Sequence, residues 1–260
     1  MRHIKKKFLF EDSFKDLDFQ NNDNFEFVAI DNLDNTTLKK AGKESFVIIQ
    51  TTEYDNLYGF IYNHNGQHIT VPMPDLTLVY YDFAYKLNIT RKDLSKEILQ
   101  KLSNKETFSE ANSDLLYNFY GYSSSCIINL FTTLESFINS LILSDKNYTR
   151  ILKNKTEIYD REQIQKGLSF YEKVNEVLPQ LFPDKNYFKK ATPKNQHIRN
   201  LKELRDMIIH TKSDTNGKSQ TEIFKRLLNF KYDETFLAVK DFVNYYKDNY
   251  IIDCPCNKEF

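Results

Sequence analysis

The spacing of apolar residues changes near residue 75, and this change constrains the fold of the chain more than any other feature. Four short apolar runs before it are typical of strands: 25–30, 45–50, 57–62 and 68–71. An Asn-His-Asn-Gly segment at 63–66 predicts a hairpin turn. Pro72 and Pro74 then interrupt the strand pattern, and later apolar residues recur three and four positions apart, as they do in helices. The sequence therefore predicts an α+β fold with a β-rich module over residues 1–75.

The remainder of the chain is expected to be helical. The segments with a helical period are 76–87, 94–102, 109–143, 160–178 and 233–246. Pro179 and Pro183 are expected to end the fourth segment, because proline removes a helical hydrogen bond. Helices joined by short loops pack as antiparallel neighbours. We therefore expect connecting helices over 76–104 and an antiparallel all-α bundle over 105–260.

Charge and composition exclude several classes of protein. Lys plus Arg and Asp plus Glu both total 36, so the net charge is zero and no global field attracts the chain to nucleic acid or to a membrane. An RNA site would therefore have to be local. The sequence contains no run of 18 apolar residues, so no membrane association is expected. The three cysteines do not form a disulfide framework, which favours a cytoplasmic location.

Motifs for metal or cofactor chemistry are missing from the sequence. It contains no glycine-rich phosphate loop, no HExxH and no paired CxxC. Cys254-Pro255-Cys256 has no second cluster of cysteine or histidine to complete a metal site, and we interpret it as an incidental C-terminal tail. We expect neither a metal ion nor a cofactor.

The stretch 205–210, Arg-Asp-Met-Ile-Ile-His, combines a permanent cation with a titratable imidazole. A guanidinium matches phosphate oxygens, and an imidazole can give or take a proton near neutral pH. Thr192-Pro193 predicts the start of the helix that carries the stretch, and Asn216-Gly217 predicts a turn after it, with the helix ending near Lys212. His210 would then lie in the last turn of that helix.

The helical geometry separates the two key side chains. Arg205 and His210 point roughly 140° apart, whereas Asp206 and His210 are i,i+4 neighbours, so that Asp206 could orient the imidazole. Arg205 must bend around the helix to reach the same site, or complement the histidine of a second subunit across a two-fold axis. The alternative is structural: Arg205 pairs with Glu203 or Asp206, and His210 only closes the helix.

A second polar feature lies in the long helix expected over 109–143. Glu135 and Asn139 interrupt its broad apolar face at i,i+4, on the stripe that also contains Phe131. A carboxylate buried there would need a partner. The alternative is that this stripe faces solvent.

With these pieces in this order, the C-terminal half resembles the HEPN superfamily. Its helical bundles carry an R-x4-6-H motif before the final helix, matched here by Arg205 and His210. Asp206 follows the arginine as in many members, and the helix with Glu135 and Asn139 is similar to a second polar helix of the family. The likeness covers roughly residues 105–250. Some family toxins carry a tyrosine two residues after the histidine, and a partner nucleotidyltransferase modifies that tyrosine. This chain departs from that pattern, because it has Lys212 at this position.

This resemblance implies a metal-independent endoribonuclease that acts as a homodimer, commonly as a toxin or an antiphage defence effector. His210 would act as general acid or base when a ribose 2′-OH attacks the adjacent phosphate. Arg205 would stabilise the developing negative charge, and Asp206 would hold the imidazole. Glu135 and Asn139 would support the site. RNA would be the substrate, and an antitoxin or defence-system partner is implied. The alternative is a HEPN-like module that binds RNA, a nucleotide or a protein without chemistry.

Overall fold

The computed structural model describes residues 3–8, 33–42, 47–49, 57–104, 110–211 and 216–255. The chain divides into two compact units. One contains residues 6–75, and the other contains residues 76–260 together with the first five residues. Ile4 forms an isolated antiparallel bridge with Asp253, which ties this N-terminal segment to the C-terminal end of the helical unit. The fold is mixed α/β and mainly helical, in agreement with the α+β class predicted from the sequence.

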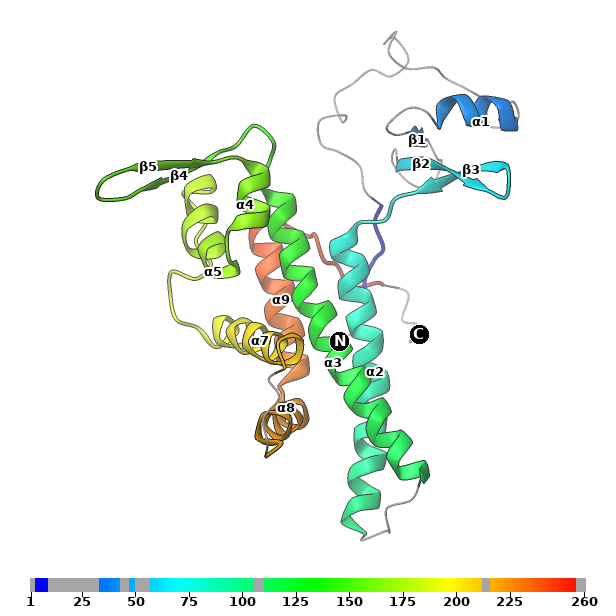
Figure 1. Ribbon diagram of the computed structural model, residues 1–260, viewed down its shortest axis with the longest axis vertical. Helices are drawn as coiled ribbons and strands as arrows, with labels where there is room; N and C mark the ends of the chain where they lie inside the picture. Colours follow the sequence, from blue (N-terminus) through cyan, green and yellow to red (C-terminus); the bar gives the residue numbers. More distant parts are fainter. Residues whose placement is uncertain are drawn as a thin grey trace. The chain divides into compact units, whose positions relative to one another are not determined.

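The smaller unit is built on a three-stranded antiparallel sheet in the order β1-β2-β3 (Figure 1). Its strands are β1 (Val47–Ile49), β2 (Leu57–His64) and β3 (Gln67–Pro72). The predicted hairpin turn is confirmed: Asn65 and Gly66 both have positive φ, 51° and 88°, as a tight hairpin requires. A short helix, α1 (Asn35–Ala41), was not predicted. The expected strand at 25–30 lies outside the described residues.

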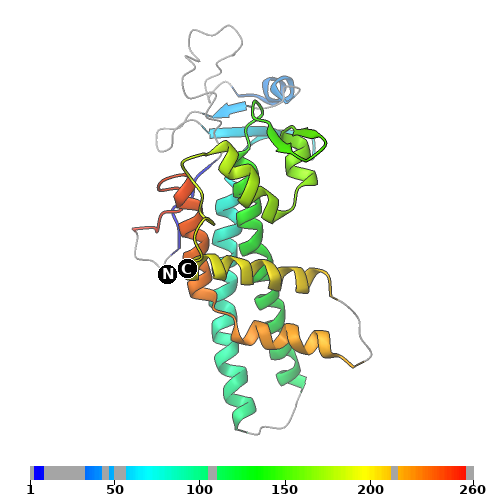
Figure 2. The same ribbon diagram turned by 90° about the vertical axis from the view of Figure 1, so that its left-hand side faces the viewer.

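The larger unit is organised around two long helices, α2 (Leu76–Ser103) and α3 (Glu110–Leu141), which lie side by side in Figures 1 and 2. The sequence predicted two helices where α2 is continuous. Its polar interruption is satisfied internally, because buried Arg91 binds the Asn88 side chain and stacks 3.8 Å from the centroid of the Tyr232 ring. The polar segment therefore packs within the helical unit instead of forming a loop.

The last helix, α9 (Tyr232–Tyr246), packs against α3 and begins close to its predicted position. Tyr81 of α2 meets Phe236 edge to face with ring centroids 5.5 Å apart, and Phe137 of α3 meets Phe242 at 6.2 Å. These contacts join α2, α3 and α9 through one apolar core.

Two shorter helices do not run parallel to the long ones. Figure 2 shows α7 (Pro193–Ile209) and α8 (Lys218–Asn229) lying across α2, α3 and α9, whereas antiparallel neighbours were expected. The α8 helix was not predicted. Gly217, with φ +62°, turns the chain into it, as the Asn-Gly signal indicated.

The connection between α3 and α7 is irregular. A hairpin of β4 (Tyr148–Ile151) and β5 (Thr156–Tyr159) comes first, and it was not predicted. The expected helix 160–178 is broken at Leu168 into α4 (Arg161–Gly167) and α5 (Phe170–Glu172), because Leu168 is extended and Ser169 caps a new helix. A π-helical turn, η4 (Lys173–Val177), and α6 (Leu178–Leu181) follow.

Pro179 does not end this helix, contrary to the sequence prediction. The N–H of Leu178 bonds the carbonyl of Lys173, five residues earlier, and the chain stays helical through Leu181. Proline is tolerated in the first turn of a helical segment, where its missing N–H costs little. A π-turn is uncommon and is often found at functional sites.

Candidate functional site

The start of α7 is fixed by the residues that the sequence indicated. The Thr192 side chain accepts a hydrogen bond from the Asn195 N–H, and Pro193 occupies the first turn. Ile198, Leu201 and Leu204 are buried, and α7 packs on α3 and α9 through this face. The positions beside this apolar face, including Arg205 and Asp206, are partly exposed next to α3.

Arg205 is held by three groups. Its guanidinium lies 3.4 Å from the Glu135 carboxylate of α3, 3.1 Å from the Asp206 carboxylate, and 4.9 Å from the centroid of the Phe131 ring. Glu135 and Phe131 are one helical turn apart, so they meet Arg205 from the same stripe of α3. The structure therefore brings together Arg205, Asp206 and Glu135, three of the five residues singled out from the sequence.

Asn139, one turn after Glu135, has a different partner. Its side-chain oxygen accepts a hydrogen bond from the Lys173 ammonium at 3.1 Å, and its backbone carbonyl accepts one from the Gln165 side chain at 3.0 Å. Lys173 also donates to the Gln165 backbone carbonyl at 2.8 Å. Burial lowers the pKa of Lys173, and the nearby Glu135 carboxylate opposes that shift. The polar stripe of α3 therefore contacts α4, η4 and α7.

A polar pocket of about 310 Å³ opens between these elements. Glu135, Lys173, Lys202, Arg205 and Asp206 supply its ionisable groups together with the more exposed Lys166. The remaining lining residues come from α3, α4 and the segment that follows: Phe131, Ile138, Gln165, Leu168, Ser169 and Phe170. The volume is at the lower end of the range for small-molecule sites. A compact charged ligand would fit its size and polarity.

Asp206 does not use its carboxylate to hold His210. One carboxylate oxygen binds Lys202 at 2.5 Å and the other binds Arg205. Burial would raise the pKa of Asp206, but the hydrogen bonds from these two cations outweigh it and hold the pKa below its usual value. The predicted orientation of the imidazole by this carboxylate is therefore not what the structure shows.

His210 lies at the C-cap of α7, where its backbone N–H bonds the Asp206 carbonyl at 2.9 Å. The residue is exposed and does not line the pocket. Within one copy of the chain, Arg205 and His210 therefore lie on different surfaces, in keeping with their angular separation on the helix. The helix ends at Ile209, and Lys212, near the predicted end, lies outside the described residues.

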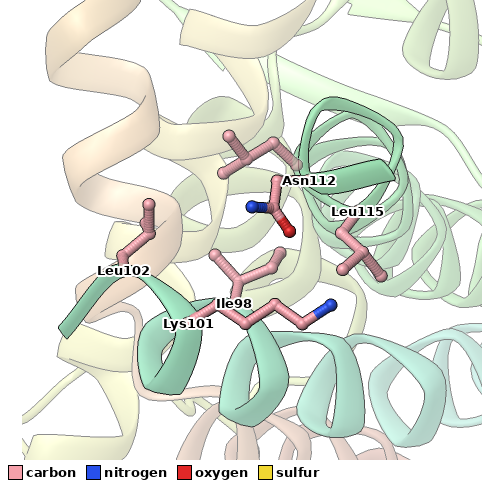
Figure 3. A pocket seen from close by; sticks show the side chains of 6 residues that line it. Ile98, Lys101, Leu102, Asn112 and Leu115 are labelled. Carbon is pink, nitrogen blue, oxygen red and sulfur yellow. The ribbon is translucent and has the colours of Figure 1, made fainter. Parts of the chain in front are cut away.

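Other parts of the described chain offer weaker sites. An apolar pocket between the end of α2 and the start of α3, lined by Ile98, Leu102 and Leu115 among others (Figure 3), holds only about 10 Å³, room for one water at most. His68 bonds Asn35 beside the hairpin turn. Cys254 has no thiol or histidine cluster around it within the described residues, and Cys256 lies outside them.

The residues described contain no group of three or more His, Cys, Asp or Glu side chains placed to bind a metal ion. In those same ranges, none of the helices has both the length and the hydropathy needed to cross a membrane.

Lys173 and Lys202 were missed by the sequence analysis. Lys202 was detectable, since it stands at i,i+4 from Asp206 and i,i+3 from Arg205 on one helical face. The place of Lys173 in the pocket could not be inferred from the sequence, because it depends on the break at Leu168 and on the π-turn that begins with Lys173.

In comparisons with known proteins, the chain matches no protein-family model, no curated protein and no solved structure.

Proposed function

We propose that this protein is a metal-independent endoribonuclease of the HEPN type, acting as a toxin or an antiphage effector in the cytoplasm. The observation that carries the proposal is the place of Arg205: its guanidinium lines a polar pocket beside Lys202 and Lys173. Three cations around one pocket in a chain of zero net charge favour an anionic ligand. This local cluster of cations can attract an anion although the chain as a whole has no net positive charge.

The chemistry needs a proton-transfer group as well as a cation. In the proposed reaction, the imidazole of His210 takes the proton of a ribose 2′-OH as that oxygen attacks the adjacent phosphorus. The bond from phosphorus to the 5′-oxygen breaks, the 5′-oxygen takes up the proton from the imidazolium and leaves as a hydroxyl, and a 2′,3′-cyclic phosphate forms. Arg205 stabilises the charge on the phosphorane oxygens. Because His210 does not line the pocket of its own chain, the proposed site takes the histidine from a second copy in a homodimer.

The direct test is an RNA cleavage assay in EDTA with a labelled mixed-sequence RNA. Wild-type protein should release products with 2′,3′-cyclic phosphate ends, and Arg205→Ala and His210→Ala should lose at least about a hundredfold in rate, as expected when a transition-state donor or a general base is removed. Arg226→Ala is a matched control, because Arg226 is also ion-paired but lies on α8, outside the pocket. His197→Ala controls for the loss of a histidine from α7. Cleavage by the Arg205/His210 double variant would refute the proposal.

A second candidate function is binding without chemistry. It is favoured by the ion pairs of Arg205 with Glu135 and Asp206, which partly neutralise the guanidinium, and by the absence of His210 from the pocket lining. A protein of this kind would retain RNA or a nucleotide uncut. Binding that requires Arg205 but is indifferent to His210→Ala, with no product in any lane, would select this alternative.

A further inference from the structure

Lys173 is a buried cation that makes no direct ion pair with a carboxylate of the described residues. The residue is only 9% exposed, and none of the described Asp or Glu side chains forms an ion pair with it. Its ammonium has three protons, and the two acceptors it has among the described residues are neutral oxygens of Asn139 and Gln165. A buried charge without an opposite charge is costly. Because Lys173 lines the polar pocket, a bound anion could accept the remaining proton.

Lys202 and Arg205 face the same pocket from α7. Their common partner on that helix is Asp206, and the Lys202 ammonium also lies 5.1 Å from the centroid of the Tyr171 ring. With Lys166, four cations line the pocket against the two carboxylates of Glu135 and Asp206. The pocket therefore has an excess of positive charge, contributed by three separate elements, α4, η4 and α7.

Glu135 places a carboxylate in the pocket, against the cations that line it. Its carboxylate contacts Arg205 and is near enough to Lys173 to influence its titration. The contact with Arg205, at 3.4 Å, is longer than a strong charge-assisted hydrogen bond, and the Glu135 side chain is 40% exposed. Such a weakly held carboxylate can be displaced by a ligand with more oxygen acceptors.

We propose that this pocket binds a phosphate group of a nucleotide unit, with Lys173, Lys202 and Arg205 as its ligands and Glu135 as the carboxylate that the phosphate displaces. The inference rests on the proposed function, which identifies that phosphate as part of an RNA backbone. It extends the site to Lys173 and Lys202, which lie outside the R-x4-H motif. A phosphate matches the pocket because its oxygens can accept from several cations at once. The volume of about 310 Å³ has room for a single nucleotide unit.

Calorimetric titration of the full-length protein can test this site without cleavage. The probes are inorganic phosphate, adenosine 5′-monophosphate and a 2′-O-methyl RNA tetranucleotide, whose blocked hydroxyls prevent cleavage. Lys173→Met and Lys202→Met should each weaken binding about tenfold, since a charge-assisted hydrogen bond is lost. Glu135→Gln should strengthen it, because the competing negative charge is removed. Lys194→Met is the matched control: Lys194 is an ion-paired lysine of α7 outside the pocket.

Thermal unfolding of each variant separates loss of binding from loss of fold, because Lys173 also links α3 to α4. If Lys173→Met fails to fold, the opposite effects of Lys202→Met and Glu135→Gln still test the site. Equal binding of the mononucleotide and the tetranucleotide would identify a nucleotide site, and binding of the tetranucleotide alone would identify an RNA backbone site. Unchanged affinity in folded Lys202→Met and Glu135→Gln, or no binding of any probe at millimolar concentration, would overturn the proposal.

Cleavage and phosphate binding can be lost independently of each other. RNA cleavage that needs Arg205 and His210, with phosphate binding insensitive to Lys202 and Glu135, would retain the ribonuclease and discard the phosphate site. Phosphate binding that needs Lys202, with RNA left intact by the wild type, would retain the site and discard the ribonuclease.

Discussion

Glu135 on α3 and Arg205 on α7 lie 3.4 Å apart at their charged groups, although 70 residues separate them in the chain. The contact joins the polar stripe of the long helix to the first residue of the R-x4-H motif. The centroid of the Phe131 ring, on the same stripe of α3, lies 4.9 Å from the guanidinium carbon. Arg205 is therefore positioned by α3 as much as by its own helix, before any ligand binds.

Glu135→Gln should have little effect on stability. The pair is partly exposed, at 23% for the Arg205 side chain and 40% for that of Glu135, and such ion pairs contribute about 0 to 1 kcal/mol. Urea unfolding should therefore show a change below about 1 kcal/mol. Phe131→Ala, which empties a fully buried position beside the same arginine, should cost roughly 3 to 5 kcal/mol. A large loss in Glu135→Gln would mean that the carboxylate is chiefly structural.

The acid stability of the segment after α4 should depend on Glu172. Hydrogen bonds from the Ser169 hydroxyl and backbone N–H, and then from Arg150, lower the pKa of Glu172 from 4.5 to about 2. Because the folded protein binds this proton more weakly than the unfolded chain does, the stabilisation is complete above pH 4.5 and is lost as the pH falls toward about 2. Thermal melts of Glu172→Gln and wild type should therefore converge over that interval.

Glu162→Gln is the control for this acid prediction. It also removes a carboxylate, from the preceding helix α4, but Glu162 is an exposed residue paired with Lys166. Melting curves of Glu172→Gln and wild type that stay separated by a constant interval down to the acid end would contradict the assignment of the pH dependence to Glu172.

The sequence identified the parts of the site that depend on local periodicity. The cap at Thr192, the course of α7, and the polar pair Glu135 and Asn139 inside an apolar helix all follow from spacing within one element. The partners of that pair did not follow, because Arg205 and Lys173 reach it from other elements. Spacing within a helix cannot specify which distant cation will meet a given carboxylate.

The fold beyond the long helices was less predictable, because its elements are short and show little periodicity of their own. The hairpin of β4 and β5 consists of strands of only four residues, too short to show a clear period of two. The break at Leu168 falls at an apolar residue that fits the helical spacing, and only the capping side chain of Ser169 distinguishes it. Lys173 is placed in the pocket by this break together with the π-turn that begins with it, and so it could not be assigned in advance.

Asn195→Ala should destabilise the protein through the start of α7. The buried Asn195 amide donates to the backbone carbonyls of Tyr187 at 3.2 Å and Lys190 at 2.6 Å, which fixes the loop before the helix. Two carbonyls would lose their donor, at a cost of roughly 2 to 4 kcal/mol. Asn200→Ala, at an exposed position of the same helix, should change the free energy of unfolding by less than about 0.5 kcal/mol. Equal urea midpoints for the two variants would contradict this account.

Mixing two inactive variants should restore cleavage if the proposed site is shared between two copies. In a heterodimer of Arg205→Ala and His210→Ala, one site loses both groups, whereas the other combines the intact Arg205 of one copy with the intact His210 of its partner. An equal mixture that exchanges subunits at random should therefore regain about one quarter of the wild-type rate. Each variant alone should stay inactive at the same total concentration. Activity that does not return, although light scattering shows that the copies exchange, would place both groups within one chain and exclude a composite site.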